Sequence, residues 1–190
     1  MTRVTKEAAE ANKRGLVDAA GRLFREKGLD GVGVAEIARS AGLTHGAIYS
    51  GFAGKSDLAV AALRRGREAG AERRTKALGN EPDVNALLMH YVSKRQRDDR
   101  INCCPLLASA SEAARQDSIY RKEFSETFLE LVSALQAAME REDTKDAHRK
   151  ALAVAAGMIG AVAMARALDR QLSDELLEAA RASFVEFAES

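Results

Sequence analysis

The chemistry in this sequence is concentrated in one short stretch, LTHGAIYSGFAGK, which runs from Leu43 to Lys55. Polar groups that can reach a phosphate or a base edge are spaced along it, and they belong to His45, Tyr49 and Ser50. Between them, Gly46 and Ala47 carry almost no side chain, so a helix that presents this face can approach a groove closely. The stretch therefore suggests nucleic-acid recognition, although a tyrosine at the edge of the core and an ordinary exposed histidine remain alternatives.

Lys55 occupies an electrostatically unfavourable position. It stands where a helix should begin, and a positive charge there opposes the helix dipole at a cost of about 0.3 kcal/mol or more. A bound anion would remove that cost, because the free N–H groups of the helix start, the Lys55 ammonium group and the Tyr49 hydroxyl can together hold a DNA phosphate. Asp57 offers an intramolecular alternative, and a solvated lysine is another.

Short helices must position these groups. The apolar spacing predicts one helix over residues 34–41 and another over residues 45–51, joined by the turn AGLT. We expect the Thr44 hydroxyl to cap the second helix and Ile48 and Phe52, four residues apart, to fasten it to the core.

A longer helix over residues 6–27 should support both, because helices of two turns are unstable alone. Its apolar side chains fall on one stripe, which consists of Leu16, Ala20, Leu23 and Phe24. Gly28 and Gly42 stand just past two of the helix ends, where a left-handed residue is favoured. Three helices in this order predict a helix-turn-helix unit over about residues 34–53.

The elements AAGRLFREKG, VAEIARSAGL and GAIYSGFAGKSDL, in this order and spacing, resemble the N-terminal DNA-binding domain of the tetracycline-repressor (TetR) family of bacterial transcription regulators. The resemblance covers about residues 12–63. It implies that Lys55 holds a phosphate and that six further residues face DNA: Thr44, His45, Gly46, Ala47, Tyr49 and Ser50. The sequence departs from the family at GVGV, where a Ser or Thr is usual, so a cap or phosphate contact near Gly33 is missing. Position 45 and positions 50–51 also differ, so the resemblance does not predict the operator.

Composition excludes several other classes. The 29 Lys and Arg residues nearly balance 28 Asp and Glu residues, so the net charge of +1 indicates no particular partner. No stretch approaches the roughly 20 apolar residues of a membrane span and no leader is recognisable, so we expect a cytoplasmic protein without a membrane partner. Cys103 and Cys104, the only cysteines, are adjacent, which disfavours a disulfide framework or a four-ligand zinc site. We expect no metal and no cofactor.

The remainder of the chain predicts further helices. Alanine and leucine dominate, β-branched runs are absent, and Pro82 and Pro105 are the only prolines, so the fold should be all-α with about nine helices. After a helix over residues 55–78, we expect one capped by Asp83, one opened by Pro105, a long one over about 119–139, one over 147–172 and one capped by Ser173.

Two domains follow from this organisation: a DNA-binding domain over residues 10–70 and a ligand-binding and dimerisation domain over residues 71–190. The last two helices are the predicted homodimer interface, because Gly157 and Gly160 permit close helix approach, although both helices can instead pack only within one chain. A dimer also follows from mechanism, since one short recognition helix reads few bases and a two-fold pair reads a palindrome.

The resemblance further implies that a small molecule binds the second domain and releases the DNA. Large or adaptable side chains that could line its cavity are Tyr91, Phe124, Phe128, Met158 and Met164, and an ordinary core role is the alternative for each. Cys104 is a further candidate ligand-binding residue. We expect a mostly apolar ligand of unknown identity.

Cys104 suggests a second mechanism, in which a thiolate activated by Lys94, Arg95, Arg97 and Arg100 senses oxidants or electrophiles and releases DNA. A buried cysteine that acts as a small hydrophobic residue is the alternative.

An enzyme is not expected, because the three histidines are scattered, no phosphate-binding glycine loop follows a strand and neither cysteine has an identifiable base. A helical protein-interaction module with only nonspecific DNA binding remains the alternative of another class.

Overall fold

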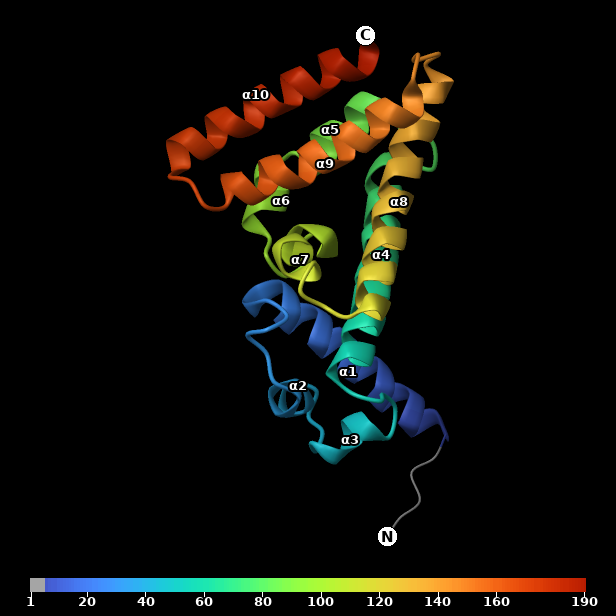
Figure 1. The fold of residues 1–190 in the computed structure, drawn as a ribbon, viewed down its shortest axis with the longest axis vertical. Helices are drawn as coiled ribbons and strands as arrows, with labels where there is room; N and C mark the ends of the chain where they lie inside the picture. The colour runs from blue at the N-terminus through green and yellow to red at the C-terminus, as the bar shows by residue number, and fades with distance from the viewer. Residues whose placement is uncertain (1–5) are drawn as a thin grey trace.

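The computed structural model describes residues 6–190, and these residues form ten α-helices and no strand (Figure 1). In chain order the helices are α1 (Lys6–Lys27), α2 (Val34–Ser40), α3 (Gly46–Tyr49), α4 (Lys55–Leu78), α5 (Val84–Tyr91), α6 (Lys94–Asp98), α7 (Pro105–Ala113), α8 (Ser118–Arg141), α9 (Ala147–Ala165) and α10 (Arg170–Glu189). The predicted all-α class is confirmed. Within the described part of the chain, no helix is both long and apolar enough to span a membrane.

Most helix ends follow the predicted signals. Gly28 and Gly42 adopt positive φ angles of 80° and 71° just past α1 and α2, a conformation that favours glycine. The Asp83 carboxylate accepts a 2.6 Å hydrogen bond from the backbone N–H of Ala86 at the start of α5. Pro105 is the first residue of α7, where its missing N–H has no helical partner to lose.

The helix that was not predicted is α6, which raises the number from about nine to ten over residues 6–190. Its sequence, KRQRD, has no apolar stripe, so periodicity does not reveal it. Its start is fixed locally, because the hydroxyl of Ser93 accepts a 3.2 Å hydrogen bond from the backbone N–H of Gln96.

The predicted junction of the last two helices was wrong. α9 ends at Ala165 rather than near residue 172, and α10 begins after Asp169, whose carboxylate caps the N–H of Leu172 at 3.1 Å. Ser173 is not the cap but lies inside α10, 1% exposed, where its hydroxyl donates a 2.7 Å hydrogen bond to the carbonyl of Ala165. The serine therefore joins the two helices instead of starting one of them.

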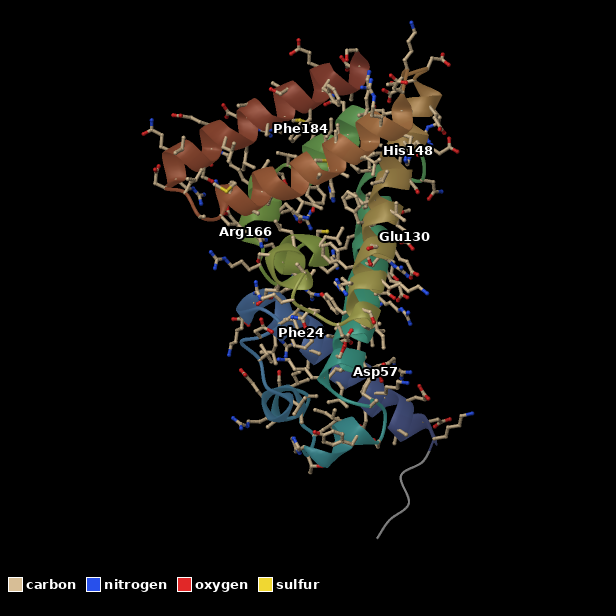
Figure 2. All side chains as sticks on the ribbon, in the orientation of Figure 1. Phe24, Asp57, Glu130, His148, Arg166 and Phe184 are labelled. Atoms are coloured by element: carbon tan, nitrogen blue, oxygen red, sulfur yellow. The ribbon has the colours of Figure 1, made fainter. Side chains whose placement is uncertain are left out.

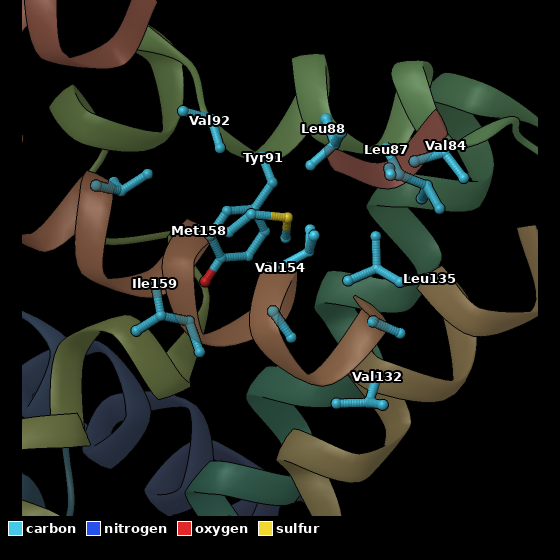
Figure 3. Packing of buried hydrophobic residues seen from close by; sticks show 14 of the residues in the cluster. Val84, Leu87, Leu88, Tyr91, Val92, Val132, Leu135, Val154, Met158 and Ile159 are labelled. Carbon is cyan, nitrogen blue, oxygen red and sulfur yellow. The ribbon is translucent and has the colours of Figure 1, made fainter. Parts of the chain in front are cut away.

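The fold has two hydrophobic cores. The first lies among α1 to α4 and buries, among others, Leu16, Leu23, Phe24, Ile37, Ile48, Phe52, Leu58 and Leu63. Tyr120 of α8 and Ala113 of α7 complete this core from the other part of the chain. The second core lies among α5 and α7 to α10 and includes Leu88, Tyr91, Leu135, Val154 and Met158 (Figure 3).

α4 and α8 run along the long axis of the molecule, while α9 and α10 lie at the end opposite to α2 and α3 (Figure 1). Arg64 of α4 donates a 2.6 Å hydrogen bond to the buried carboxylate of Glu123 on α8. The residue 70–71 boundary between the two expected domains falls inside α4, so a continuous helix connects them.

Candidate functional site

The short α3 is held to the protein by its apolar side. Ile48 is fully buried, and Phe52, just after the helix, is 6% exposed in the same core. Lys13 of α1 lies over the Phe52 ring, 5.4 Å from its centroid, which adds a cation–π contact. These contacts fix α3 so that its remaining side chains face outward, as the sequence predicted.

The outer face of α3 is polar and exposed. Tyr49 is 57% exposed, and its ring meets that of His45 edge to face at a centroid distance of 5.4 Å. The Ser50 hydroxyl donates a 2.7 Å hydrogen bond to the carbonyl of Ala47, and Gly46 leaves open space around its Cα. The small residues thus keep the centre of the face low while the aromatic pair projects from it.

Thr44 does not cap α3 as predicted. The N-cap residue is His45, in a helical conformation, and no side chain accepts a hydrogen bond there. The reason is that the turn already runs helically into α3: the carbonyl of Thr44 accepts from the N–H of Ala47 at 3.0 Å. Thr44 is exposed, and its hydroxyl has no intramolecular partner among the described residues, which leaves it available to a ligand.

Lys55 is the first residue of α4, as predicted, and is half-buried. The N-cap position is Gly54, so no side chain caps this helix start. Asp57 does not pair with Lys55, because its carboxylate accepts a 3.1 Å hydrogen bond from the N–H of Ala53. Within residues 6–190, Lys55 has no ion-pair partner, and Asp57 is the acidic residue in the first turn of α4.

Two neighbouring features complete this surface. Gly33 is the N-cap of α2 and offers no side-chain hydrogen bond, in agreement with the expected missing cap. Lys13, which the sequence analysis did not single out, lies beside the end of α3, since a Cβ on Gly51 would be 3.7 Å from its Cγ. Lys13 lies 38 residues before Gly51, so its proximity depends on tertiary packing that residue spacing cannot reveal.

A cavity of about 140 Å³ lies among α4, α5, α7, α8 and α9. Its interior is apolar, with side chains from Leu87, Leu106, Leu131, Leu135 and Met158. One wall carries charged and polar groups, which are Arg67, Arg73, Arg74, His90, Gln96, Asn102, Thr127 and Glu130. The cavity can enclose a small molecule that has both apolar and polar parts.

The structure brings together only part of the predicted lining. Tyr91, Cys104 and Met158 line this cavity, whereas Phe124 and Phe128 do not. The two phenylalanines pack against the cores instead, because the face of α8 turned to the cavity carries Thr127, Leu131 and Leu135. Met164, which was also predicted to line the cavity, does not line it either.

Met164 is 55% exposed near the end of α9 and lies outside the cavity lining. Met158 is fully buried on the same helix, six residues away, so the two methionines face different sides of α9. Their spacing of six residues could have predicted that they lie on different faces of the helix, whereas their residue type could not.

The side chains of Tyr91 and Cys104 are neighbours in the cavity lining. Burial raises the pKa of Tyr91 well above its usual value, and the neighbouring Cys104 thiol adds to the effect. The two groups are close enough to interact electrostatically, yet the Tyr91 hydroxyl makes no hydrogen bond of normal geometry. Burial also raises the pKa of the Cys104 thiol.

The basic residues expected to activate Cys104 do not do so. Arg97 is buried and bonds to Asp98 and Asp174 at 2.7 and 2.5 Å, and Lys94 bonds to Asp174 at 2.7 Å. The groups that lower the pKa of Cys104 are Tyr91 and the backbone N–H groups of Leu106 and Leu107, and they do not offset the effect of burial. Over residues 6–190, no three His, Cys, Asp or Glu side chains cluster as metal ligands would.

The fold and these two sites define a helix-turn-helix protein whose second helical part holds a cavity. A family model described as "Bacterial regulatory proteins, tetR family" matches residues 16–62. Another, "Transcriptional regulator LmrA/YxaF-like, C-terminal domain", matches residues 83–183. The chain therefore belongs to the TetR family, as the sequence resemblance implied. The matching models and relatives describe transcription regulators, not enzymes.

Individual relatives resemble the chain in two ways. The HTH-type transcriptional regulator AcrR of Shigella flexneri is 45% identical over 58 residues, which is 30% of this chain and 27% of AcrR. The match to such curated relatives thus spans less than a third of their length. A TetR regulator from Chloroflexus aurantiacus shares the fold over 95% of this chain and 96% of its own, with a TM-score of 0.80 and 24% identity. A TetR-family regulator from Cytophaga hutchinsonii has a TM-score of 0.76 at 22% identity over 97% and 98% of the two chains.

Proposed function

We propose that the protein is a cytoplasmic transcription regulator that binds a palindromic operator as a homodimer, represses transcription, and releases the DNA when a small molecule enters the cavity. The observation that carries the proposal is the exposed polar face of α3 beside the uncapped, positively charged start of α4. Family membership supports DNA binding, and repression is the family's usual mode.

In the proposed complex, α3 enters the major groove. Thr44, His45 and Ser50 face base edges or phosphates, with Gly46 and Ala47 providing clearance. Lys55, the free N–H groups of α4 and the Tyr49 hydroxyl hold one backbone phosphate. Lys13 is a further candidate for a phosphate contact because it is exposed beside α3.

The homodimer would form through α9 and α10. Between Lys150 and Arg166, α9 carries no charged residue, although its exposed positions include Ala153, Ala156, Gly160, Ala163 and Met164. A neutral exposed helix face is typical of a surface that another chain covers. Two copies of this helix pair would make a four-helix bundle.

The two glycines of α9 support different contacts. A Cβ on Gly157 would lie 2.7 Å from the ring of Phe184 on α10, the residue labelled in Figure 2, so this glycine serves packing within one chain. A Cβ on Gly160 would meet nothing within 4 Å, which leaves that position open to a partner helix.

Fluorescence anisotropy tests the proposal directly. Labelled fragments from the region flanking the protein's own gene are compared with scrambled DNA at about 150 mM salt, where nonspecific binding is weak. Tight binding that depends on a palindrome is expected. Equal, weak binding to all fragments, including genomic fragments selected by repeated rounds of binding, would instead favour the nonspecific interaction module.

A further inference from the structure

The cavity wall carries more positive charge than its neighbours neutralise. Arg67 pairs with Glu130 at 2.9 Å and with the buried Glu123 at 3.6 Å. Glu130, labelled in Figure 2, is the only carboxylate residue among the described residues that line the cavity. Arg73 donates a 2.9 Å hydrogen bond to the carbonyl of Asn102, which is neutral. Arg74 has no ion-pair partner within the described part of the chain. At least one guanidinium group at the cavity is thus uncompensated.

The pKa of His90 is affected by the positive charge of the same arginines. Its pKa is lowered first by burial and then by the positive charges of Arg95, Arg74 and Arg73. Asp99 is the carboxylate within electrostatic reach of Arg73, but it already accepts hydrogen bonds from Ile101 and Asn102. The wall formed by α4 and α5 is therefore a positive surface.

A second unsatisfied group lies in the interior. Tyr91 lines the cavity, and its buried hydroxyl has no hydrogen-bond partner of normal geometry. A tyrosine hydroxyl is protonated at neutral pH, and burial raises its pKa further, so it can donate a hydrogen bond. A buried donor of this kind costs free energy until an acceptor meets it.

A glycine leaves room in the cavity for a ligand that bears such an acceptor. Gly70 lies in the middle of α4, where alanine would be the better helix former, and a Cβ there would meet nothing within 4 Å. Gly66, one turn earlier, is by contrast tightly packed, since a Cβ there would lie 3.3 Å from Pro105. The open glycine thus widens the cavity, whose 140 Å³ is close to the roughly 150 Å³ of a protein cavity that holds benzene.

We propose that this cavity binds a small organic carboxylate with an apolar body of about one ring, on which a further oxygen accepts a hydrogen bond from Tyr91. The carboxylate lies toward Arg74, Arg73 and His90, and the apolar body lies over Gly70. This refines the expectation of a mostly apolar ligand. The inference rests on the proposed function only in taking the cavity as the effector site.

Isothermal titration calorimetry of the full chain without DNA tests the charge. Benzoate is compared with benzamide, which has the same shape and no charge. Benzoate is expected to bind one molecule per chain at least about tenfold more tightly than benzamide, because charge-assisted hydrogen bonds are roughly twice as strong as neutral ones. Arg74→Gln should remove this preference. The matched control Lys76→Gln, which removes an exposed charge two residues away on α4, should retain it.

The second polar contact is tested with 4-hydroxybenzoate against 4-methylbenzoate, which differ in the acceptor but hardly in size. The wild-type protein should prefer the hydroxy acid severalfold, and Tyr91→Phe should abolish that preference. Gly70→Leu should exclude all three acids while circular dichroism shows an intact fold. His90, followed by NMR, should show a higher pKa in the benzoate complex.

Three results would overturn the inference: none of the acids binds at millimolar concentration, benzamide binds as tightly as benzoate, or Arg74→Gln binds benzoate like the wild type. A protein that binds its operator but no carboxylate would refute this inference alone. A protein that binds benzoate but no specific DNA would refute the proposed function alone.

Discussion

The backbone N–H of Leu29, two residues beyond α1, donates a 2.8 Å hydrogen bond to the carboxylate of Glu112 on α7. The bond connects the helix-turn-helix end of the molecule to the helical part that holds the cavity. Gly28 lies directly beneath it, because a Cβ on Gly28 would be 2.6 Å from the same carboxylate. Arg25 of α1 also bonds to the carbonyl of Ile101, in the loop that carries Asn102 and Cys104 into the cavity wall.

Gly28→Ala should therefore destabilise the protein more than Gly42→Ala. Both glycines follow a helix end with a similar positive φ, 80° and 71°, and a Cβ on Gly42 would meet nothing within 4 Å. Only the alanine at 28 displaces Glu112 and leaves the N–H of Leu29 without its acceptor, which adds about 1 kcal/mol. Urea unfolding measures the difference. Equal losses for the two variants would show that the Glu112 contact contributes nothing.

Tyr49→Phe and Lys55→Gln should each weaken operator binding without changing the fold. We expect a loss of roughly 1–3 kcal/mol for the lysine and a salt dependence reduced by about one ion, because one phosphate contact disappears. Anisotropy over a range of salt concentrations gives both values. Lys76→Gln, on the same helix but far from its start, is the control. A uniform effect of all three substitutions would contradict a specific phosphate site.

Ala156→Glu should convert a dimer into monomers. The residue is exposed on the neutral face of α9, and two-fold symmetry would bring two like charges together in the interface. Light scattering after size-exclusion chromatography measures the mass. Ala137→Glu, an exposed alanine of α8, is the matched control. A dimer that persists in the α9 variant would place the interface elsewhere.

Acid should weaken the contact between α6 and α10. Hydrogen bonds from Lys94 and then Arg97 lower the pKa of Asp174 from 3.8 to about 2. Because the folded-state pKa is depressed, the stabilisation is complete above the ordinary pKa and is lost as pH falls from about 4 towards 2. Asp174→Asn should reduce the pH dependence of the urea midpoint in that window. Glu178→Gln, which has no ion pair among the described residues, should leave it unchanged.

Cys104 should react slowly with thiol reagents. Since burial raises its pKa, little thiolate is present at neutral pH, and we expect alkylation by iodoacetamide at least about tenfold slower than that of a free thiol. Mass spectrometry of the Cys103→Ala variant isolates Cys104. Rapid alkylation, together with DNA release that Cys104→Ser prevents, would restore the thiol-sensing alternative.

Local signals in the sequence were sufficient for the DNA-binding end. Glycines at positive φ, a spacing of four between Ile48 and Phe52, and a lysine at a helix start each have a meaning that depends on near neighbours alone. The structure agrees with them at Gly28, Gly42, Phe52 and Lys55. The prediction that Thr44 caps α3 was wrong, because the N-cap position is its neighbour His45, which has a helical conformation.

The cavity was less predictable because it depends on which side of each helix faces inward. Tyr91, Cys104 and Met158 lie in its wall, whereas Phe124 and Phe128 pack against the cores and Met164 is exposed. The sequence did not predict that Arg73 and Arg74 line the cavity. Both belong to a basic run that starts at Arg64 and has the sequence pattern of a solvated helix face. Only the packing of α5 and α8 against α4 shows that these arginines border an enclosed space.

The continuity of α4 has a mechanical consequence. From Gly70 at the cavity to Lys55 at its start, the helix spans about 22 Å at 1.5 Å per residue. A tilt of about 5° at the cavity therefore displaces Lys55 by about 2 Å, which is enough to break a hydrogen bond to a phosphate. In the proposed homodimer this helix would act as a lever arm, so a ligand that changes its angle only slightly would decide whether two recognition helices still match the spacing of one turn of DNA.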